Sequence, residues 1–351
     1  MSEPEILFER RGTAGLITLN RPKALNAVTL AMVRALTPQL GEWADDPAVT
    51  RVVLTAAGER AFSAGGDIRA LYEAGRAGKH AEALAFWREE YQLNARIKRY
   101  PKPYVSLIDG IVMGGGVGIS VHGSHRVAGD RFSFAMPEVG IGFFPDIGAT
   151  WFLPRLPGEL GAYCALTGER LATADAVAGT VATQRVPSAR FPELLDGLCG
   201  AVSVDALLAA FAEPVQPGSV TAKRTAIDRL FAFDRVEDIL GACDREAAAG
   251  KADAGFARAT AATIRTKSPL SLKIALAQVR AGRFMAFDDC MRTEFRIVSR
   301  IVHGHDFYEG VRAVIIDKDN APVWRPASLA EVTAAEVERH FAPLETDELV
   351  L

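Results

Sequence analysis

Short runs of strand-forming residues alternate with glycine-rich turns and helical stretches between Ile6 and about Val186 of this 351-residue chain. The runs ILFER, GLITLN, RVVLTA, YVSLI and RVAG have the composition and alternation of β-strands. Helical periodicity predicts helices over residues 30–43, 81–97 and 116–121. Elements in this order indicate an α/β fold of repeated ββα-like units, although no strict sequence period accompanies the repeat.

The pattern changes beyond about Pro187, where strand-like runs end and alanine-rich segments of helical periodicity follow one another. These segments are SVDALLAAFAEP, TAIDRLFAF, DRVEDILGACDREAAAG, GFARATAATIRTK and SLKIALAQVRAG. We therefore predict a core over residues 1–186 and a helical region over residues 187–351 that serves as a lid or an assembly surface. The polar end of the chain, LETDELVL, is expected to be poorly ordered.

Composition argues against several classes of function. A net charge of −3 gives no basic field for nucleic acid or an anionic membrane. The four cysteines lie far apart without a CxxC pair, which argues against a zinc site and a disulfide scaffold. The N-terminal residues lack a signal-peptide pattern, and no run of about 18 apolar residues suits a membrane span. We expect a cytoplasmic protein without a bound metal, and we interpret His303 and His305 in VHGHD as surface or capping residues.

Two stretches carry more glycine than a strand or helix favours. Gly65 and Gly66 precede a helical run in AFSAGGDIRALYEAG, and Gly114 and Gly115 follow a strand in PYVSLIDGIVMGGGVGISVHG. Each can be a tight turn, or it can present free backbone N–H groups to an anion or a developing oxyanion. Neither stretch has the spacing of a dinucleotide or P-loop motif. Acyl-transfer chemistry needs two such donors at one carbonyl oxygen.

The segment FAMPEVGIGFFPDIGAT places two carboxylates, Glu138 and Asp146, among apolar residues, glycine and proline. A buried charge is costly unless it is paired, protonated or used in function. The two residues are therefore either an ion-paired feature of a loop or candidates for catalysis.

The segments RPKALNAVT, SAGGDI, MGGGVG and FAMPEVGIGFFPDIG occur in this order, and together they resemble the crotonase, or enoyl-CoA hydratase/isomerase, superfamily. The resemblance implies a spiral of ββα units followed by helices, assembly as a trimer or hexamer, and an acyl-CoA ligand whose CoA is part of the substrate, with no separate cofactor. It also implies oxyanion-hole N–H groups on Gly66 and Gly115. Residues expected near CoA are Lys23, Ala24, Leu25, Ala64, Asp67 and Ile68.

A closer resemblance, to the 3-hydroxyisobutyryl-CoA hydrolase subfamily, runs from about Ile6 to about Phe341. It includes WREEYQLNARIKRYPKPYVSLIDG, FAMPEVGIGFFPDIGATWFLPRL, SPLSLKIALAQ and HDFYEGVRAVIIDKDNAPVWRP. Hydratases of the superfamily carry a second glutamate at the position of Gly118 and commonly a glycine at that of Asp146. This rearrangement of carboxylates matches the hydrolase subfamily. By position, the residues that contact substrate are Glu90, Gly115, Glu138 and Asp146.

The resulting hypothesis is hydrolysis of a short-chain 3-hydroxyacyl-CoA thioester, 3-hydroxyisobutyryl-CoA in valine breakdown. Glu138 would attack the carbonyl carbon to form an anhydride, or activate water as general base, and Asp146 would bind the 3-hydroxyl. Glu90 would also reach that hydroxyl, unless it belongs to a solvated helix face. Two alternatives stay open, double-bond hydration or isomerisation on Glu138 and a non-catalytic acyl-CoA-binding or RNA-associated protein.

Overall fold

The computed structural model describes residues 3–351, which form two compact units built from separate stretches of chain. Unit 1 comprises Met1–Asp67, Glu89–Ala135 and Arg170–Thr221, and unit 2 comprises Ile68–Arg88, Met136–Glu169 and Ala222–Leu351. The predicted division into a core over residues 1–186 and a helical region over residues 187–351 stays a prediction.

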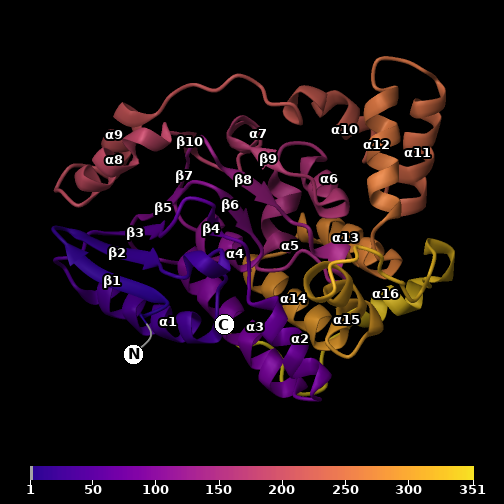
Figure 1. Ribbon diagram of the computed structural model, residues 1–351, viewed down its shortest axis with the longest axis horizontal. Helices are drawn as coiled ribbons and strands as arrows, with labels where there is room; N and C mark the ends of the chain where they lie inside the picture. The colour runs from indigo at the N-terminus through magenta and orange to yellow at the C-terminus, as the bar shows by residue number, and fades with distance from the viewer. Residues whose placement is uncertain (1–2) are drawn as a thin grey trace. The chain divides into compact units, whose positions relative to one another are not determined.

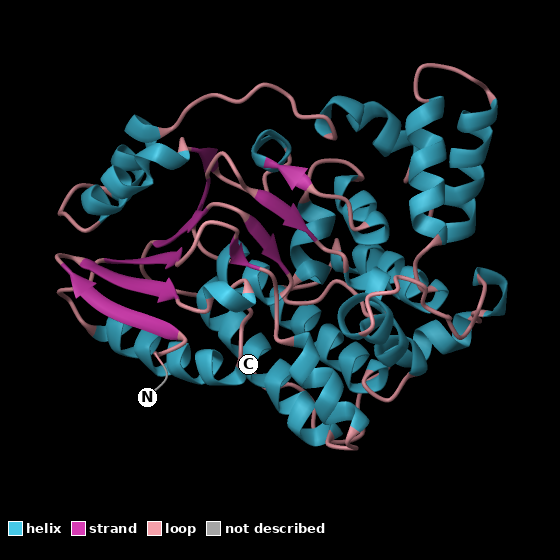
Figure 2. Cartoon of the chain, viewed as in Figure 1, coloured by secondary structure: helices cyan, strands magenta, loops and turns pink. Residues whose placement is uncertain are grey.

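Unit 1 contains two β-sheets (Figure 2). The six-stranded sheet has the order β1-β2-β3-β5-β7-β10, with β1 Ile6–Arg11, β2 Ala14–Leu19, β3 Arg51–Ala56, β5 Tyr104–Ile108, β7 His125–Ala128 and β10 Gln184–Arg185. The four-stranded sheet has the order β4-β6-β8-β9, with β4 Ala61–Ser63, β6 Ile111–Met113, β8 Ser133–Ala135 and β9 Leu171–Ala172. All neighbours are parallel except the antiparallel pairs β1–β2 and β8–β9.

The order of these strands along the chain shows a repeated ββα unit, although the sequence itself has no strict period. The consecutive pairs β3–β4, β5–β6 and β7–β8 each give their first strand to the six-stranded sheet and their second to the four-stranded sheet. Helices α2 (Ile68–Arg76) and α3 (His80–Lys98) follow the first pair, and α4 (Gly115–Val121) follows the second. The predicted α/β fold of ββα units is therefore confirmed.

One face of the six-stranded sheet is covered by α8 (Phe191–Leu198) and α9 (Val204–Phe211). Leu194 and Leu198 of α8 lie four residues apart, as do Val204 and Leu208 of α9, so each helix turns one apolar stripe inward. These side chains pack on alternate residues of the strands, including Val53 and the inward residues Ala14, Leu16, Val105, Leu107 and Val127. Helix α7 (Thr173–Ala178) is a further helix of unit 1.

Helix α1 (Leu30–Asp45) also belongs to unit 1 and begins at a side-chain cap. The Oγ1 atom of Thr29 accepts a hydrogen bond from the N–H of Met32 at 3.2 Å. The helix buries Trp43 against the strand residue Gly15, where a Cβ atom would overlap the indole ring. The packing of α1 on the sheet therefore depends on that glycine.

Unit 2 is helical, and its α11 and α12 lie side by side at the orange part of the chain (Figure 1). Besides α2 and the first part of α3, its helices are α5 Ala149–Phe152, α6 Leu160–Thr167, α10 Arg224–Leu230, α11 Val236–Ala248, α12 Ala254–Arg265, α13 Pro269–Gly282, α14 Phe287–Ile301, α15 His305–Val311 and α16 Ala334–Phe341. All five helices predicted beyond residue 187 are present, and no strand follows β10 in residues 3–351.

The C-terminal tail contradicts the expectation of poor order. The side chain of Leu349 is buried, and the guanidinium of Arg88 donates to the carbonyl oxygens of Asp347 and Glu348. Arg296 forms an ion pair of 2.7 Å with the Glu348 carboxylate. Burial of Leu349 and the contacts with the two arginines therefore hold the segment in place despite its polar composition.

Within the described residues, no helix has the length and apolar character needed to cross a membrane.

Candidate active site

The glycine turn after β4 lies against the loop that precedes α1, within unit 1. Val28 donates its N–H to the carbonyl of Gly65 at 2.8 Å and accepts the N–H of Asp67 at 3.0 Å. In a parallel bridge of this kind the backbone N–H of the central residue, Gly66, points away from the partner strand. The N–H of Gly66 is therefore left for another acceptor.

The second glycine turn brings Gly115 beside this N–H group. Gly114 has φ 43° and ψ −128°, a conformation that suits glycine, and it directly precedes α4. A Cβ atom on Gly115 would lie 3.2 Å from the nitrogen of Gly66 and 2.5 Å from Oε1 of Glu90. Three residues predicted to contact the substrate therefore meet at one place in unit 1.

Both glycines carry N–H groups that the backbone of residues 3–351 leaves without an acceptor. Gly115 is the first residue of α4, so its N–H has no partner inside the helix. Among residues 3–351, neither the N–H of Gly66 nor that of Gly115 donates to another backbone group. Two adjacent free N–H groups of this kind can bind the oxygen of a thioester carbonyl and the oxyanion that forms from it.

Five of the six residues predicted to lie near CoA lie beside the first glycine turn, which contains Gly65 and Gly66. The N–H of Ala64 donates to the carbonyl of Leu25 at 2.9 Å, and Lys23 and Ala24 are exposed next to it. Asp67 pairs with the guanidinium of Arg21 at 3.2 Å. These five residues lie together in unit 1, whereas Ile68 is the first residue of α2 in unit 2.

One residue that stabilises this loop, Asn26, was not predicted from sequence. Leu25 and Asn26 both have positive φ, 51° and 54°. The buried amide of Asn26 donates to the carbonyls of Ala57 and Ala61 and accepts the N–H of Arg21. The signal for Asn26 is its residue type, because asparagine tolerates the left-handed region and bonds to nearby backbone.

Glu90 does not lie on a solvated face of α3. Its side chain is 2% exposed, whereas its neighbour Glu89 forms a bidentate ion pair with Arg34 at 2.8 and 2.6 Å. The two adjacent glutamates therefore have different surroundings, and only Glu90 borders the glycine turns.

Glu138 begins a 3₁₀ turn, Glu138–Ile141, in unit 2. Its side chain is 6% exposed, and its Oε2 atom has no hydrogen-bond partner among the described residues. Burial, and secondly the charge of Asp146, raise the pKa of Glu138 well above its usual value. A buried carboxyl of this kind is costly to keep in the ionised form and suited to proton transfer or nucleophilic attack.

Asp146 lies close enough to Glu138 for their charges to interact, and it is 5% exposed. It precedes two residues of positive φ, Ile147 at 55° and Gly148 at 89°, and then α5. The structure thus brings together the two predicted carboxylates within unit 2. The charge of Asp146 therefore acts on Glu138 and contributes to its raised pKa.

A further buried carboxylate, Glu294 on α14, was missed by the sequence analysis. Its Oε2 and Oε1 atoms accept the N–H groups of Gly148 at 2.7 Å and Thr150 at 2.8 Å. Burial raises the pKa of Glu294 to about 8, and the charge of Asp146 adds to the increase. The signal is an acidic residue within the apolar stripe of an amphipathic helix, between Cys290 and Val298.

Helix α15 packs directly against the 3₁₀ turn that carries Glu138. A Cβ atom on Gly142 would overlap the carbonyl of Asp306, and one on Gly310 would overlap the backbone of Ile141. Glycine at both positions lets the two backbones approach more closely than a side chain permits. The position of Glu138 therefore depends on α15.

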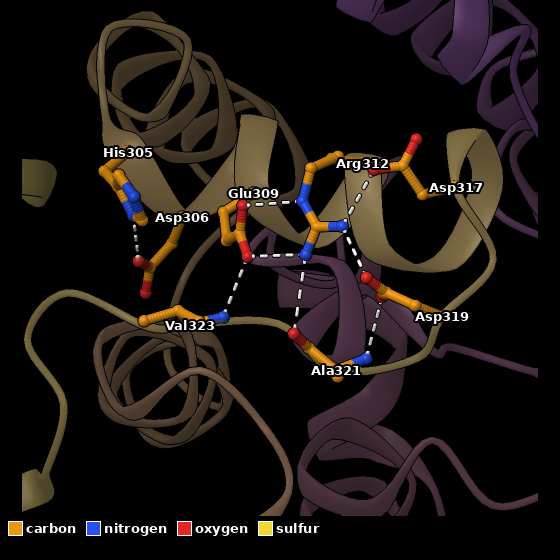
Figure 3. Close-up of polar contacts among 8 residues, drawn as sticks. All are labelled: His305, Asp306, Glu309, Arg312, Asp317, Asp319, Ala321 and Val323. Carbon is orange, nitrogen blue, oxygen red and sulfur yellow. Dashed lines mark hydrogen bonds and ion pairs between the residues drawn. The ribbon is translucent and has the colours of Figure 1, made fainter.

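An ion-pair network holds α15 to the chain that follows it (Figure 3). Arg312 donates to both carboxylate oxygens of Glu309 at 2.9 and 2.8 Å, and also to Asp317 and Asp319. Glu309 in turn accepts the N–H of Val323 at 2.9 Å. The bidentate pair with Arg312 is the main reason that the pKa of Glu309 falls to about 2.

We expect Arg312→Gln to lower the free energy of unfolding at pH 7, because several charge-assisted hydrogen bonds are lost. The folded-state pKa of Glu309 is depressed, so its contribution is present above the unfolded value near 4.5 and disappears as pH falls toward 2. Urea unfolding at pH 7 and pH 3 should show a smaller difference between variant and wild type at the lower pH. Arg292→Gln, which removes one exposed pair with Asp289, is the control. An equal loss in both variants would contradict the role of the network.

The histidines of VHGHD have structural neighbours. The ring of His303 packs on that of His80 at 4.4 Å, and Nδ1 of His305 lies 3.1 Å from Oδ1 of Asp306. In the part of the chain that the structure describes, no group of three or more histidine, cysteine or acidic side chains is arranged to hold a metal.

This chain belongs to the enoyl-CoA hydratase/isomerase family, whose sequence model matches residues 14–341. A curated relative, the mitochondrial 3-hydroxyisobutyryl-CoA hydrolase of Danio rerio, is 46% identical over 357 residues, covering 99% of this chain and 92% of the relative. A solved structure of a carnitinyl-CoA dehydratase from Mycobacterium thermoresistibile has a TM-score of 0.92 and 45% identity over 99% of both chains. An enoyl-CoA hydratase from Rhodobacter sphaeroides has a TM-score of 0.91 and 39% identity, covering 99% of this chain and 100% of the other. The resemblance to the superfamily and the crotonase-like fold are thereby confirmed.

Proposed function

We propose that the protein hydrolyses a short-chain 3-hydroxyacyl-CoA thioester, 3-hydroxyisobutyryl-CoA, to 3-hydroxyisobutyrate and CoA. The observation that carries the proposal is the buried pair of Glu138 and Asp146, joined to the absence of a carboxylate at Gly118. A curated relative at 46% identity is a hydrolase of this thioester. Thioester cleavage also suits the two free N–H groups at Gly66 and Gly115.

In the proposed reaction, the thioester carbonyl oxygen accepts the N–H groups of Gly66 and Gly115. Either the Glu138 carboxylate attacks the carbonyl carbon, CoA leaves as the thiol and water hydrolyses the anhydride, or Glu138 takes a proton from the attacking water. Both routes break the C–S bond and add one water. The carboxylate must be ionised to start either route, so the raised pKa of Glu138 places the acidic limb of the pH profile above its usual position.

In the same proposal, Asp146 and Glu90 bind the 3-hydroxyl group of the acyl chain, and the segment from Lys23 to Leu25, together with Ala64, Asp67 and Ile68, contacts CoA. The proposed reaction needs no separate cofactor, because CoA is carried by the substrate. Assembly as a homo-oligomer, trimer or hexamer, a cytoplasmic location and a place in valine breakdown remain predictions; the Danio rerio relative is a mitochondrial protein.

Chemistry at a carbon–carbon double bond is the second candidate. The two solved structures named above are a dehydratase and a hydratase, and Glu138 alone can move one proton. Against this candidate, Gly118 supplies no second carboxylate at the hydratase position, and Asp146 is buried beside Glu138.

The test is a panel of four thioesters, 3-hydroxyisobutyryl-CoA, 3-hydroxypropionyl-CoA, crotonyl-CoA and a 3-enoyl-CoA. Each reaction is scored for free thiol and for an altered acyl group that is still attached to CoA. The proposal expects free thiol from the two hydroxyacyl thioesters. Altered acyl-CoA without thiol would support double-bond chemistry, and binding without turnover would support a non-catalytic acyl-CoA-binding protein.

Asp146→Asn should lower the preference for 3-hydroxyisobutyryl-CoA over isobutyryl-CoA about tenfold, because a charge-assisted hydrogen bond to the hydroxyl becomes a neutral one. The acidic limb of the pH profile should also move to lower pH, since the charge that raises the pKa of Glu138 is removed. The readouts are kcat/KM for both thioesters between pH 5 and pH 9, a range of about two units on each side of neutral. An unchanged preference would show that Asp146 does not contact the hydroxyl.

A further inference from the structure

Glu294 joins α14 to the short helix that follows Asp146. It is 0% exposed, and each of its carboxylate oxygens accepts one backbone N–H, from Gly148 and from Thr150. Gly148 directly precedes α5, and Thr150 is its second residue. One side chain therefore satisfies two donors that a helix of this length cannot satisfy internally.

The backbone held by these bonds is strained. Ile147 has φ 55°, and a β-branched residue adopts the left-handed region only at an energetic cost. Such a conformation persists only where the surrounding structure fixes it. Ile147 is the residue between Asp146 and the N–H that Glu294 holds, so the strain lies at the connection to Asp146.

The other side of Asp146 is fixed independently. Gln278 on α13 donates its side-chain amide to the carbonyl of Pro145. The carbonyl of Asp146 itself accepts the N–H of Ala149 at 3.0 Å. The Gln278 contact therefore fixes the backbone before Asp146, and the Glu294 contacts fix the backbone after it. Together they set the direction in which the Asp146 side chain points.

We propose that Glu294 is a positioning residue that orients the Asp146 carboxylate toward the 3-hydroxyl group of the substrate. The inference rests on the proposed function, in which Asp146 binds that hydroxyl. Glu294 acts through the backbone of Gly148 and Thr150. It thereby contributes to the choice of acyl group rather than to cleavage of the C–S bond.

The test compares 3-hydroxyisobutyryl-CoA with isobutyryl-CoA, which has the same carbon skeleton without the hydroxyl. Glu294→Gln keeps the side-chain shape but offers one carbonyl oxygen to two N–H groups, so one donor loses its acceptor. We expect the ratio of kcat/KM for the two thioesters to fall about fivefold, as a displaced Asp146 contacts the hydroxyl less well. In the double variant with Asp146→Asn, the ratio should fall no further than in Asp146→Asn alone.

Asp175→Asn is the matched control. Asp175 is 1% exposed in unit 1, and its Oδ1 accepts the N–H groups of Val220 and Thr221 at 3.1 and 2.7 Å. Asparagine keeps an Oδ1 acceptor but lacks the charge, so the replacement weakens buried bonds to backbone N–H groups within unit 1, whereas Asp146 belongs to unit 2. It should lower the melting temperature and leave the preference for the hydroxylated thioester unchanged.

Equal losses for both thioesters in Glu294→Gln, or an unchanged ratio, would overturn the inference. If that variant does not fold by circular dichroism, Glu294→Asp, which keeps the carboxyl group on a shorter side chain, is measured in the same way. A reduced ratio then supports the inference and a wild-type ratio overturns it. Wild-type protein that cleaves neither thioester would refute the proposed function and the inference with it. Cleavage with a hydroxyl preference that Glu294→Gln leaves intact would refute only the role of Glu294.

Discussion

Glu138→Gln is expected to reduce hydrolysis of 3-hydroxyisobutyryl-CoA roughly 1,000-fold, the largest effect of any single substitution proposed for this chain. Glutamine matches the shape of the buried side chain, which is 6% exposed, but it can neither attack the carbonyl carbon nor accept a proton from water. Because the side chain is not placed in CoA recognition, the dissociation constant for CoA should stay within about twofold of wild type. The measurements are thiol release under steady-state conditions and calorimetric titration with CoA.

Glu336→Gln controls for the substitution itself, since Glu336 lies in the first turn of α16 as Glu138 lies in the first turn of its 3₁₀ helix. The control variant should retain wild-type turnover. Near-normal thiol release by a folded Glu138→Gln protein would remove Glu138 from the reaction.

Gly115→Ala is expected to lower kcat about 100- to 1,000-fold, the range seen when an oxyanion donor is lost. The added methyl group would lie 3.2 Å from the nitrogen of Gly66 and 2.5 Å from Oε1 of Glu90. It therefore occupies the space between the two donors and displaces a buried carboxylate. The displacement should also reduce the melting temperature, so kcat is measured well below the temperature at which the variant unfolds.

Gly255→Ala is the matched control for this experiment. Gly255 also lies in the first turn of a helix, α12, but a Cβ atom there meets nothing within 4 Å. Turnover should be unchanged in the control. A folded Gly115→Ala protein with wild-type kcat would show that the oxyanion is stabilised elsewhere.

Strands and helices could be predicted from sequence where the segment is long enough to show strand alternation or helical periodicity. The strand runs GLITLN and RVVLTA and the helix predicted over residues 81–97 correspond to β2, β3 and α3. The strands of the four-stranded sheet escaped prediction, because AFS, IVM and SFA are three residues each and show no measurable alternation. Their pairing partners are distant in sequence, so only the folded chain reveals the second sheet.

The residues of the candidate site also differ in whether the sequence alone could predict them. Gly66, Gly115, Glu138 and Asp146 carry local signals, since glycine clusters and charges in apolar segments can be read from sequence. The burial of Glu90 could not be read, because WREEY places two glutamates side by side and helical periodicity alone left both options open. Glu294 is more than 140 residues from the turn that it holds, as its hydrogen bonds to Gly148 and Thr150 span 146 and 144 residues. A contact of that range leaves no local pattern.

The most direct measurement uses one substrate that has two distinguishable fates. Hydrolysis of 3-hydroxyisobutyryl-CoA yields 3-hydroxyisobutyrate and free CoA, whereas loss of water from the same molecule yields methacrylyl-CoA with its thioester intact. Mass spectrometry of a reaction with the wild-type protein should find free CoA and 3-hydroxyisobutyrate in equal amounts, and Glu138→Gln should abolish both. Methacrylyl-CoA without free CoA would contradict the proposed hydrolysis and assign the protein to double-bond chemistry.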